Sequence, residues 1–181
     1  MFSRPAAVVA IVAMSSVSAL ADPQQETLQV FREIQKQINY YGYFTIFDNV
    51  EVGIDEAGLV TLTGSVTNPF KKRGIERRVD NVDGVLAVDN QIEVLPVSRL
   101  DNRLRYQVAR AIYGHPSFGQ YIRAHPSIHI VVKRGHVTLT GVVNTEGDRT
   151  LALSEAGHVG AFSVTSELKT SDEAEAALEF L

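Results

Sequence analysis

The order of hydrophobic and polar positions repeats itself along the chain, in two stretches at 26–95 and 100–169. The first stretch opens with apolar residues three or four positions apart, at Leu28, Phe31, Ile34 and Ile38. That spacing predicts an amphipathic helix, for which Thr27 is a candidate N-cap and Gly42 a candidate stop. The second stretch repeats the spacing at Leu104, Val108 and Ile112.

Alternating apolar residues after each predicted helix indicate a β-hairpin. In the first copy the alternation runs through Val50, Val52 and Ile54, and then through Val60, Leu62 and Val66. Pairing Ile54 with Val60 leaves a three-residue loop that ends at Gly58, which takes the left-handed conformation. The second copy is one residue shorter here, and Val132 then pairs with Val137. Because a one-residue slip would turn every side chain to the other face, the agreement of the two registers supports the hairpin.

A helix and a final strand complete each copy. In the first copy Asn68-Pro69 is a favourable helix start, because proline fits the first helical turn. The buried side of this helix is predicted from Phe70, Ile75, Val79 and Val82. Gly84 ends the helix and 85–94 forms the last strand, whereas in the second copy the equivalent helix covers 146–156.

This order of elements predicts an α+β fold class. We expect two tandem α-β-β-α-β repeats, each a small mixed sheet packed on two helices. The repeats are joined at 95–98, where Pro96 marks a break. Each has about 70 residues, which is enough for a small core. An acidic C-terminal tail, 170–181, follows the second repeat.

The first 21 residues belong to neither repeat. One positive charge at Arg4 precedes nine apolar residues, Ala6 to Met14, and Ala19-Leu20-Ala21 is a small-x-small cleavage site. This order predicts a signal peptide over 1–21. A membrane anchor is the alternative, but a spanning helix needs roughly 20 apolar residues. We therefore expect export with cleavage after Ala21, and no transmembrane segment once the signal is removed.

Composition narrows the possible chemistry. The 181 residues are 45% hydrophobic and 21% charged, the balance of a folded globular chain. There is no cysteine, which excludes disulfides, iron–sulfur clusters, cysteine-ligated zinc, thiol catalysis and a lipoprotein anchor. The formal net charge of −4 argues against a general nucleic-acid binder.

Charge is distributed unevenly between the repeats. Residues 26–95 contain seven basic and eleven acidic side chains, a net of −4, whereas 96–170 contain nine basic and five acidic, a net of +4. The opposite signs favour docking of the repeats on each other, or attraction of the second repeat to an anionic surface. Two solvated surfaces without a preferred partner are the remaining alternative.

The hairpin and the final strand carry a family resemblance. A hairpin with Gly-x-Val-x-Leu-x-Gly, followed by a helix and Val82-Asp-Gly-Val-x-x-Val88-x-Asn90-x-Ile92, resembles the BON domain family. These are bacterial osmotically inducible and nodulation-type domains, often found in tandem behind an export signal. We interpret the motif positions as structural: Gly58, Gly64, Gly84 and Asn90 in the first copy, and Gly135, Gly141 and Gly160 in the second. Ser166 stands in the second copy where the first has Asn90, and a short insertion lies around 114–125.

The resemblance implies binding and envelope maintenance, without catalysis and without a cofactor. Similar proteins are periplasmic, are linked to osmotic or envelope stress, and contact phospholipid or other envelope components. We therefore expect a non-enzymatic periplasmic protein that binds anionic phospholipid or envelope components and supports envelope integrity or the osmotic stress response. The alternative is a soluble chaperone-like or adaptor module that binds polypeptide partners through its sheet edges or the 113–128 insertion.

Two groups of residues are candidates for contact with anionic lipid. The first is a basic cluster on the helix that starts at Pro69, namely Lys71, Lys72, Arg73, Arg77 and Arg78. The second lies in the second repeat and combines Arg105, Arg110 and Arg123 with the aromatic residues Tyr113, Phe118 and Tyr121. Each basic residue near an anionic surface contributes about 1 kcal/mol, and aromatic rings favour the interface. The alternatives are that the basic residues form the solvated side of a core helix and that the rings fill a core.

The five histidines all lie in the second repeat, at His115, His125, His129, His136 and His158. A metal site is one interpretation of that concentration. The predicted hairpin places His129 and His136 four residues apart along the strand, about 13 Å, which is too far for one zinc ion. We expect no metal site, and no serine stands beside a histidine at a catalytic spacing. An enzyme with a histidine-based site is the third functional hypothesis.

Overall fold

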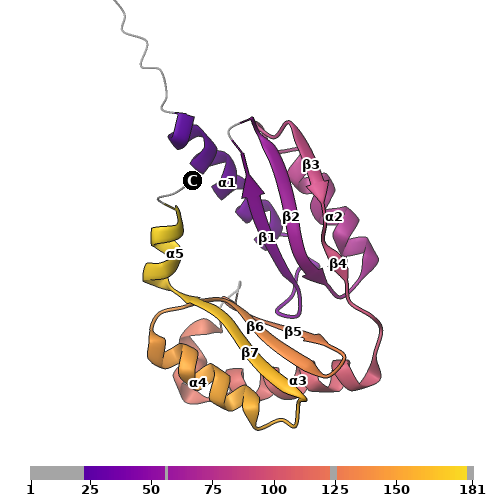
Figure 1. Ribbon diagram of the computed structural model, residues 1–181, viewed down its shortest axis with the longest axis vertical. Helices are drawn as coiled ribbons and strands as arrows, with labels where there is room; N and C mark the ends of the chain where they lie inside the picture. The colour runs from indigo at the N-terminus through magenta and orange to yellow at the C-terminus, as the bar shows by residue number, and fades with distance from the viewer. Residues whose placement is uncertain (1–22, 56, 123–125, 179–181) are drawn as a thin grey trace, which may run out of the picture.

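Two repeats, each built around a small mixed sheet with helices on one side, make up the part of the chain that the computed structural model describes, residues 23–55, 57–122 and 126–178 (Figure 1). The signal peptide predicted over 1–21 lies outside these residues, as do Arg123 and His125. The α+β fold class with tandem α-β-β-α-β repeats is confirmed.

The first repeat contains, in chain order, α1 (Pro23–Asn39), β1 (Asn49–Ile54), β2 (Leu59–Val66), α2 (Pro69–Asp80), β3 (Ala87–Asn90) and β4 (Glu93–Val94). β2 is the central strand: β1 pairs with it antiparallel, and β3 and β4 pair with it in parallel. The core lies between the two helices and one face of the sheet, and includes Ile34, Ile38, Val60, Leu62, Ile75 and Val79.

The second repeat contains α3 (Arg99–Gly114), the short 3-10 helix η1 (Pro116–Tyr121), β5 (Ile128–Lys133), β6 (His136–Val143), α4 (Glu146–Gly157), β7 (Ser163–Thr170) and α5 (Ser171–Leu178). β6 is central, with β5 antiparallel and β7 parallel to it. Its core includes Val108, Ile112, Ile130, Leu139, Ala152 and Leu168. The sheet therefore has the same topology as in the first repeat.

Both predicted hairpin registers are confirmed, with Ile54 opposite Val60 and Val132 opposite Val137. Gly58 has a φ of 81°, and a Cβ there would lie 2.5 Å from the Gly84 carbonyl oxygen, so this loop requires glycine. The tighter turn of the second hairpin is stabilised by hydrogen bonds from its backbone to a side chain of α3. Asp101, buried at the start of α3, accepts the N–H groups of Arg134 and Gly135 at 3.0 and 2.7 Å.

Two predicted helix boundaries are wrong. α1 begins at Pro23, so Thr27 lies inside the helix and is not its N-cap. α2 ends at Asp80, well before Gly84, because the side-chain amide of Asn81 donates to the Arg77 carbonyl oxygen and satisfies the last turn.

The predicted strand over 85–94 is divided into β3 and β4, and Asn90 lies at the break. The Asn90 amide donates to the Lys72 carbonyl oxygen at 3.2 Å and to the Glu76 carboxylate at 3.1 Å, both in α2. In the second repeat Ser166 takes the place of Asn90, and β7 is continuous. The motif asparagine therefore ties the last strand to the preceding helix, which periodicity alone does not reveal.

Most of the acidic tail forms a helix, α5. Thr170 and Glu173 form a capping box, in which the Thr170 N–H donates to Glu173 Oε2 at 2.7 Å and the Glu173 N–H donates to Thr170 Oγ1 at 3.3 Å. Glu173 also pairs with Arg149 of α4 at 3.1 Å. The tail is therefore part of the second repeat as far as Leu178.

The loop between α1 and β1 belongs to the first repeat and packs against the second. The Ile46 carbonyl oxygen accepts the N–H of Ile130, in β5, at 2.7 Å. The Phe47 ring packs against the second core, with its centroid 5.2 Å from that of Tyr106 in α3. The repeats are therefore docked through backbone and aromatic contacts of one loop.

Candidate functional site

Lys71, the first member of the predicted basic cluster, is buried rather than exposed. α2 turns one stripe of side chains to the core, formed by Lys71, Gly74, Ile75 and Val79. This orientation leaves Phe70, which was expected in the core, 39% exposed. Lys71 Nζ donates to the Asp48 carboxylate at 2.6 Å and to Thr67 Oγ1 at 2.8 Å. Lys71 therefore stabilises the first repeat and is not part of a surface patch.

Asp48 is the centre of this buried polar cluster. Its carboxylate also accepts the backbone N–H and the hydroxyl of both Thr45 and Thr67, at 2.7 to 2.8 Å. Burial is the largest influence and by itself raises the pKa of Asp48, but the hydrogen bonds from Lys71, Thr45 and Thr67 together hold that pKa below its usual value. The cluster fixes the end of the loop that docks the two repeats.

Arg105 and Tyr113, both candidates for lipid contact, instead protect the outer edge of β5. Arg105 is buried and donates from Nη2 to the Val132 carbonyl oxygen at 2.8 Å. The half-buried Tyr113 donates from its hydroxyl to the Ile128 carbonyl oxygen at 2.5 Å, and burial raises the pKa of Tyr113. Because unpaired edge groups invite pairing with other chains, these two side chains have a structural role.

The aromatic residues of the insertion are also internal. Phe118 is fully buried and Tyr121 is 5% exposed. The Tyr121 hydroxyl donates to the Asp148 carboxylate at 2.9 Å and accepts the Asn144 N–H at 2.8 Å. The rings therefore fill the core of the second repeat, as the alternative interpretation held. Arg110 is exposed on α3, so the described part of the second repeat does not bring the predicted residues to one surface.

The remaining members of the basic cluster lie on the outside of α2. Arg73, Arg77 and Arg78 are exposed and Lys72 is half-buried. Within the described residues, none of these four side chains has a carboxylate within 4.0 Å. Arg77 donates to the Arg73 carbonyl oxygen at 3.3 Å. The helix therefore presents cationic groups that are free to meet an anionic ligand.

Three aromatic side chains that were not among the predicted lipid contacts, Tyr41, Tyr43 and Phe70, lie beside these arginines. The Tyr43 ring, 61% exposed, lies 5.2 Å from that of Phe70 and 5.6 Å from that of Tyr41, edge-on in both cases. The Arg78 guanidinium lies 5.0 Å from the centre of the Tyr41 ring, a cation–π contact. The sequence does carry a signal for the two tyrosines, because four of the five residues at 40–44 are aromatic.

Gly74 allows this arrangement. A Cβ at Gly74 would lie 2.1 Å from the Tyr41 hydroxyl oxygen, so only glycine lets that side chain lie across α2. A hollow of about 540 Å³ results, lined by Gln37, Tyr41, Tyr43, Gly74, Arg77, Arg78 and Asn81. We call the group around it the Tyr–Arg surface, made of the half-buried Tyr41 and the exposed Tyr43, Phe70, Arg73, Arg77 and Arg78.

Two further properties of the described residues bear on function. They contain no group of three or more histidine, aspartate or glutamate side chains arranged to hold a metal ion. Nor does any helix among them have the length and apolar character needed to cross a membrane.

Comparison with known protein families gives two matches along the chain. A model of the BON domain matches residues 29–96 and again residues 101–172. BON domains are associated with phospholipid binding and with osmotic stress proteins, and the family is generally non-catalytic. No curated protein matches the chain.

Two solved structures of CdsD, a structural protein of the type III secretion system of Chlamydia trachomatis, are similar to this chain. The first is 17% identical, with a TM-score of 0.31, and the match covers 83% of this chain and 97% of that chain. The second, the CdsD C-terminal domain, is 17% identical with a TM-score of 0.31, and the match covers 77% and 96%.

The two domain matches together cover most of the sequence and coincide with the two repeats seen in the structure. The chain therefore belongs to the BON domain family, as a protein with two BON domains in tandem.

Proposed function

We propose that this protein is a non-enzymatic envelope protein that binds anionic phospholipid through the Tyr–Arg surface of its first domain. One observation carries the proposal. Three exposed arginines without carboxylate partners in the described chain lie beside exposed aromatic rings on one surface. Cations adjacent to aromatic side chains are the combination expected where a protein meets lipid headgroups.

The geometry of α2 supports this use of the surface. Phe70, Arg73 and Arg77 are three or four residues apart, so they follow one face of the helix. Each arginine near an anionic surface contributes about 1 kcal/mol, and the attraction is screened within roughly 8–10 Å at ordinary salt. With only three such charges, binding should be reversible and should weaken as salt is added.

The family association and the N-terminal sequence support the setting. BON domain proteins are typically periplasmic and include osmotic stress proteins. A signal peptide over 1–21 would deliver the chain to that compartment, where it would support envelope integrity or the osmotic stress response. The adaptor alternative is less favoured, because β5 has its outer edge occupied by Ile46, Arg105 and Tyr113, and the insertion turns its aromatic rings inward.

Vesicle binding by the mature chain, residues 22–181, tests the proposal. We expect co-sedimentation with phosphatidylglycerol vesicles at low salt, and little with phosphatidylcholine vesicles. Replacing three arginines together (Arg73→Gln, Arg77→Gln and Arg78→Gln) should weaken binding on the order of 100-fold, because about 3 kcal/mol of attraction is removed.

A matched variant provides the control. Arg99, Arg103 and Arg110 are also exposed, but they lie on α3. Replacing these three by glutamine changes net charge equally and should leave vesicle binding within a few-fold of the original. Equal losses in both variants would contradict the assignment to the Tyr–Arg surface. If the unaltered protein ignores phosphatidylglycerol vesicles even at low salt, the lipid proposal fails and the adaptor alternative replaces it.

A further inference from the structure

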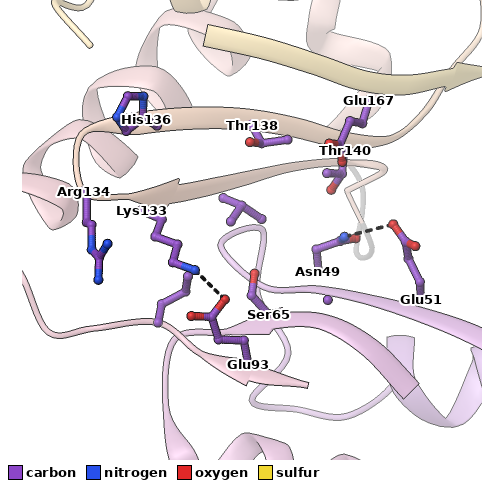
Figure 2. A pocket seen from close by; sticks show the side chains of 13 residues that line it. Asn49, Glu51, Ser65, Glu93, Lys133, Arg134, His136, Thr138, Thr140 and Glu167 are labelled. Atoms are coloured by element: carbon purple, nitrogen blue, oxygen red, sulfur yellow. Dashed lines mark hydrogen bonds and ion pairs between the residues drawn. The ribbon is translucent and has the colours of Figure 1, made fainter. Parts of the chain in front are cut away.

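A cleft of about 570 Å³ lies between the two domains and is lined by both (Figure 2). Most of the side chains that line it are polar and come from the sheet faces that the helices leave uncovered, with Leu95 and Val131 among them as apolar residues. Thr138 and Thr140 of β6 point to this side because the alternate residues Val137 and Leu139 are buried in the core. The volume lies within the range of small-ligand sites, which are generally concave and largely preformed.

The charges in this cleft are separated into two ends. Glu51 of β1 and Glu167 of β7 lie at one end, where no basic group in the described chain comes within 4.0 Å of either carboxylate (Figure 2). Arg134 and His136 lie at the other end, at the turn of the second hairpin (Figure 2). A ligand that fits both ends must carry a positive and a negative group.

Several charged and polar groups at the basic end already have an ion-pair or hydrogen-bond partner within the protein. Lys133 pairs with Glu93 of the first domain at 2.7 Å, across the cleft. The Asp101 carboxylate accepts backbone N–H groups of the turn. His136 Nδ1 lies 2.7 Å from Ser163 Oγ. The Arg134 guanidinium has no carboxylate within 4.0 Å in the described residues, so it is the free cation at this end.

An unpartnered buried hydroxyl lines the acidic end. Thr140 is 4% exposed, and its Oγ1 has no hydrogen-bond partner among the described residues. Thr140 is also directly opposite Glu167 in the pairing of β6 with β7. A buried polar group without a partner is costly, so a polar ligand atom beside Glu167 would satisfy it.

The register of β6 sets the distance between the two ends. His136 and Thr140 are four residues apart on one strand, which corresponds to about 13 Å. An extended peptide has the same rise per residue, so about four residues separate its terminal ammonium and carboxylate groups by that distance.

We propose that the inter-domain cleft binds a short peptide of about four residues with both termini free. The terminal ammonium group lies between Glu51 and Glu167, near the Thr140 hydroxyl, and the terminal carboxylate meets Arg134 and His136. Charge-assisted hydrogen bonds at both ends fix the length and the direction of the peptide. This site uses no residue of the Tyr–Arg surface and is independent of lipid binding.

A titration of the mature chain, residues 22–181, with the peptide Ala-Gly-Ala-Gly tests the proposal, with amide chemical shifts as the readout. We expect saturable shifts at Thr138, Thr140 and Glu167. Acetylating the amino terminus or amidating the carboxyl terminus should each raise the dissociation constant about tenfold or more, because each removes a charged hydrogen-bonding group. The four-residue peptide should bind more tightly than Ala-Gly or the eight-residue repeat of the same sequence.

Variants locate the two ends separately. Glu167→Gln should abolish the preference for a free amino terminus, and Arg134→Gln the preference for a free carboxyl terminus. Asp80→Asn, at the exposed end of α2, makes the same charge change as Glu167→Gln and should alter neither preference. Glu167→Gln should also leave phosphatidylglycerol vesicle binding unchanged. The absence of saturable shifts up to millimolar peptide, or equal affinity for free and doubly blocked peptide, would overturn the proposal.

Discussion

Two lysines that are adjacent in the sequence, Lys71 and Lys72, have opposite environments. Lys71 Nζ is buried and 2.6 Å from the Asp48 carboxylate, whereas Lys72 is half-buried and has no carboxylate within 4.0 Å in the described chain. A helix turns by about 100° per residue, so neighbours point to different sides. At these two positions the orientation of the side chain, and not the residue type, determines whether the lysine stabilises the core or faces solvent.

Lys71→Met should destabilise the protein by about 3–5 kcal/mol, because it leaves the buried Asp48 charge without its cation. Lys72→Met removes the same charge from the solvent side of the helix and should change the free energy of unfolding by no more than about 0.5 kcal/mol. Urea denaturation of both variants measures the difference. Equal stability of the two variants would show that the Asp48–Lys71 ion pair does not hold the fold.

At the scale of the element, β5 shows how a strand at the edge of a sheet is shielded. Three of its residues meet groups from outside the sheet: the Ile130 N–H binds the Ile46 carbonyl oxygen, and Arg105 and Tyr113 bind carbonyl oxygens at either end of the strand. Side chains selected for their charge and aromaticity as lipid ligands therefore complete the hydrogen bonding of a strand.

Tyr113→Phe should destabilise the second domain by about 1–2 kcal/mol, because it leaves the carbonyl oxygen of the buried Ile128 without the hydroxyl that satisfies it. Tyr106→Phe, at a ring that is 60% exposed, should have little effect on stability. Thermal or urea unfolding compares the two. Because the ring is retained, Tyr113→Phe should leave vesicle binding unchanged, and weaker binding by this variant would argue for a direct role of the hydroxyl at lipid.

At the scale of the whole molecule, the two domains are held together by non-covalent contacts of the loop between α1 and β1 with the second domain. His129 of β5 lies in this contact, with its ring 5.4 Å from that of Phe44. Burial, the largest influence, lowers the pKa of His129, while backbone hydrogen bonds at Asp48 and Thr45 and the Asp48 charge act in the opposite direction. The docked arrangement therefore favours neutral His129.

Stability should fall as the pH is lowered through the range that begins near the ordinary histidine pKa of 6.5. Below that value the unfolded chain binds a proton at position 129, whereas the folded chain does so only at lower pH, so acid favours unfolding. His129→Phe removes this contribution, and its stability should decline less than that of the unaltered protein between pH 7.5 and 5.5. Urea denaturation at several pH values measures the two slopes, and identical slopes would contradict the assignment.

The sequence predicted most of the fold because local patterns dictate it. Alternation at 50–54 and 60–66 fixed which face of the hairpin is buried, and both registers were confirmed. The break at Asn90 could not be predicted, because it depends on contacts with α2, as far as 18 residues away in the chain. Of the candidate site, the exposed arginines of α2 were in the predicted cluster. Two of their aromatic neighbours, Tyr41 and Tyr43, come from the loop after α1, and the third, Phe70, is on α2 but was predicted to lie in the core.

Local sequence patterns were enough to predict the tandem repeat, the order helix-strand-strand-helix-strand in each copy, and the register of each hairpin, since each pattern involves residues close together in the chain. They did not predict the short helix η1 or the tail helix α5. Which polar and aromatic side chains are available at the surface depends instead on contacts between residues far apart in the chain. Lys71 meets Asp48 from 23 residues away, and Arg105 meets Val132 from 27 residues away. Burial of a charged or aromatic side chain depends on a distant partner that can satisfy its polar atoms or surround its ring, and composition and periodicity do not specify that partner.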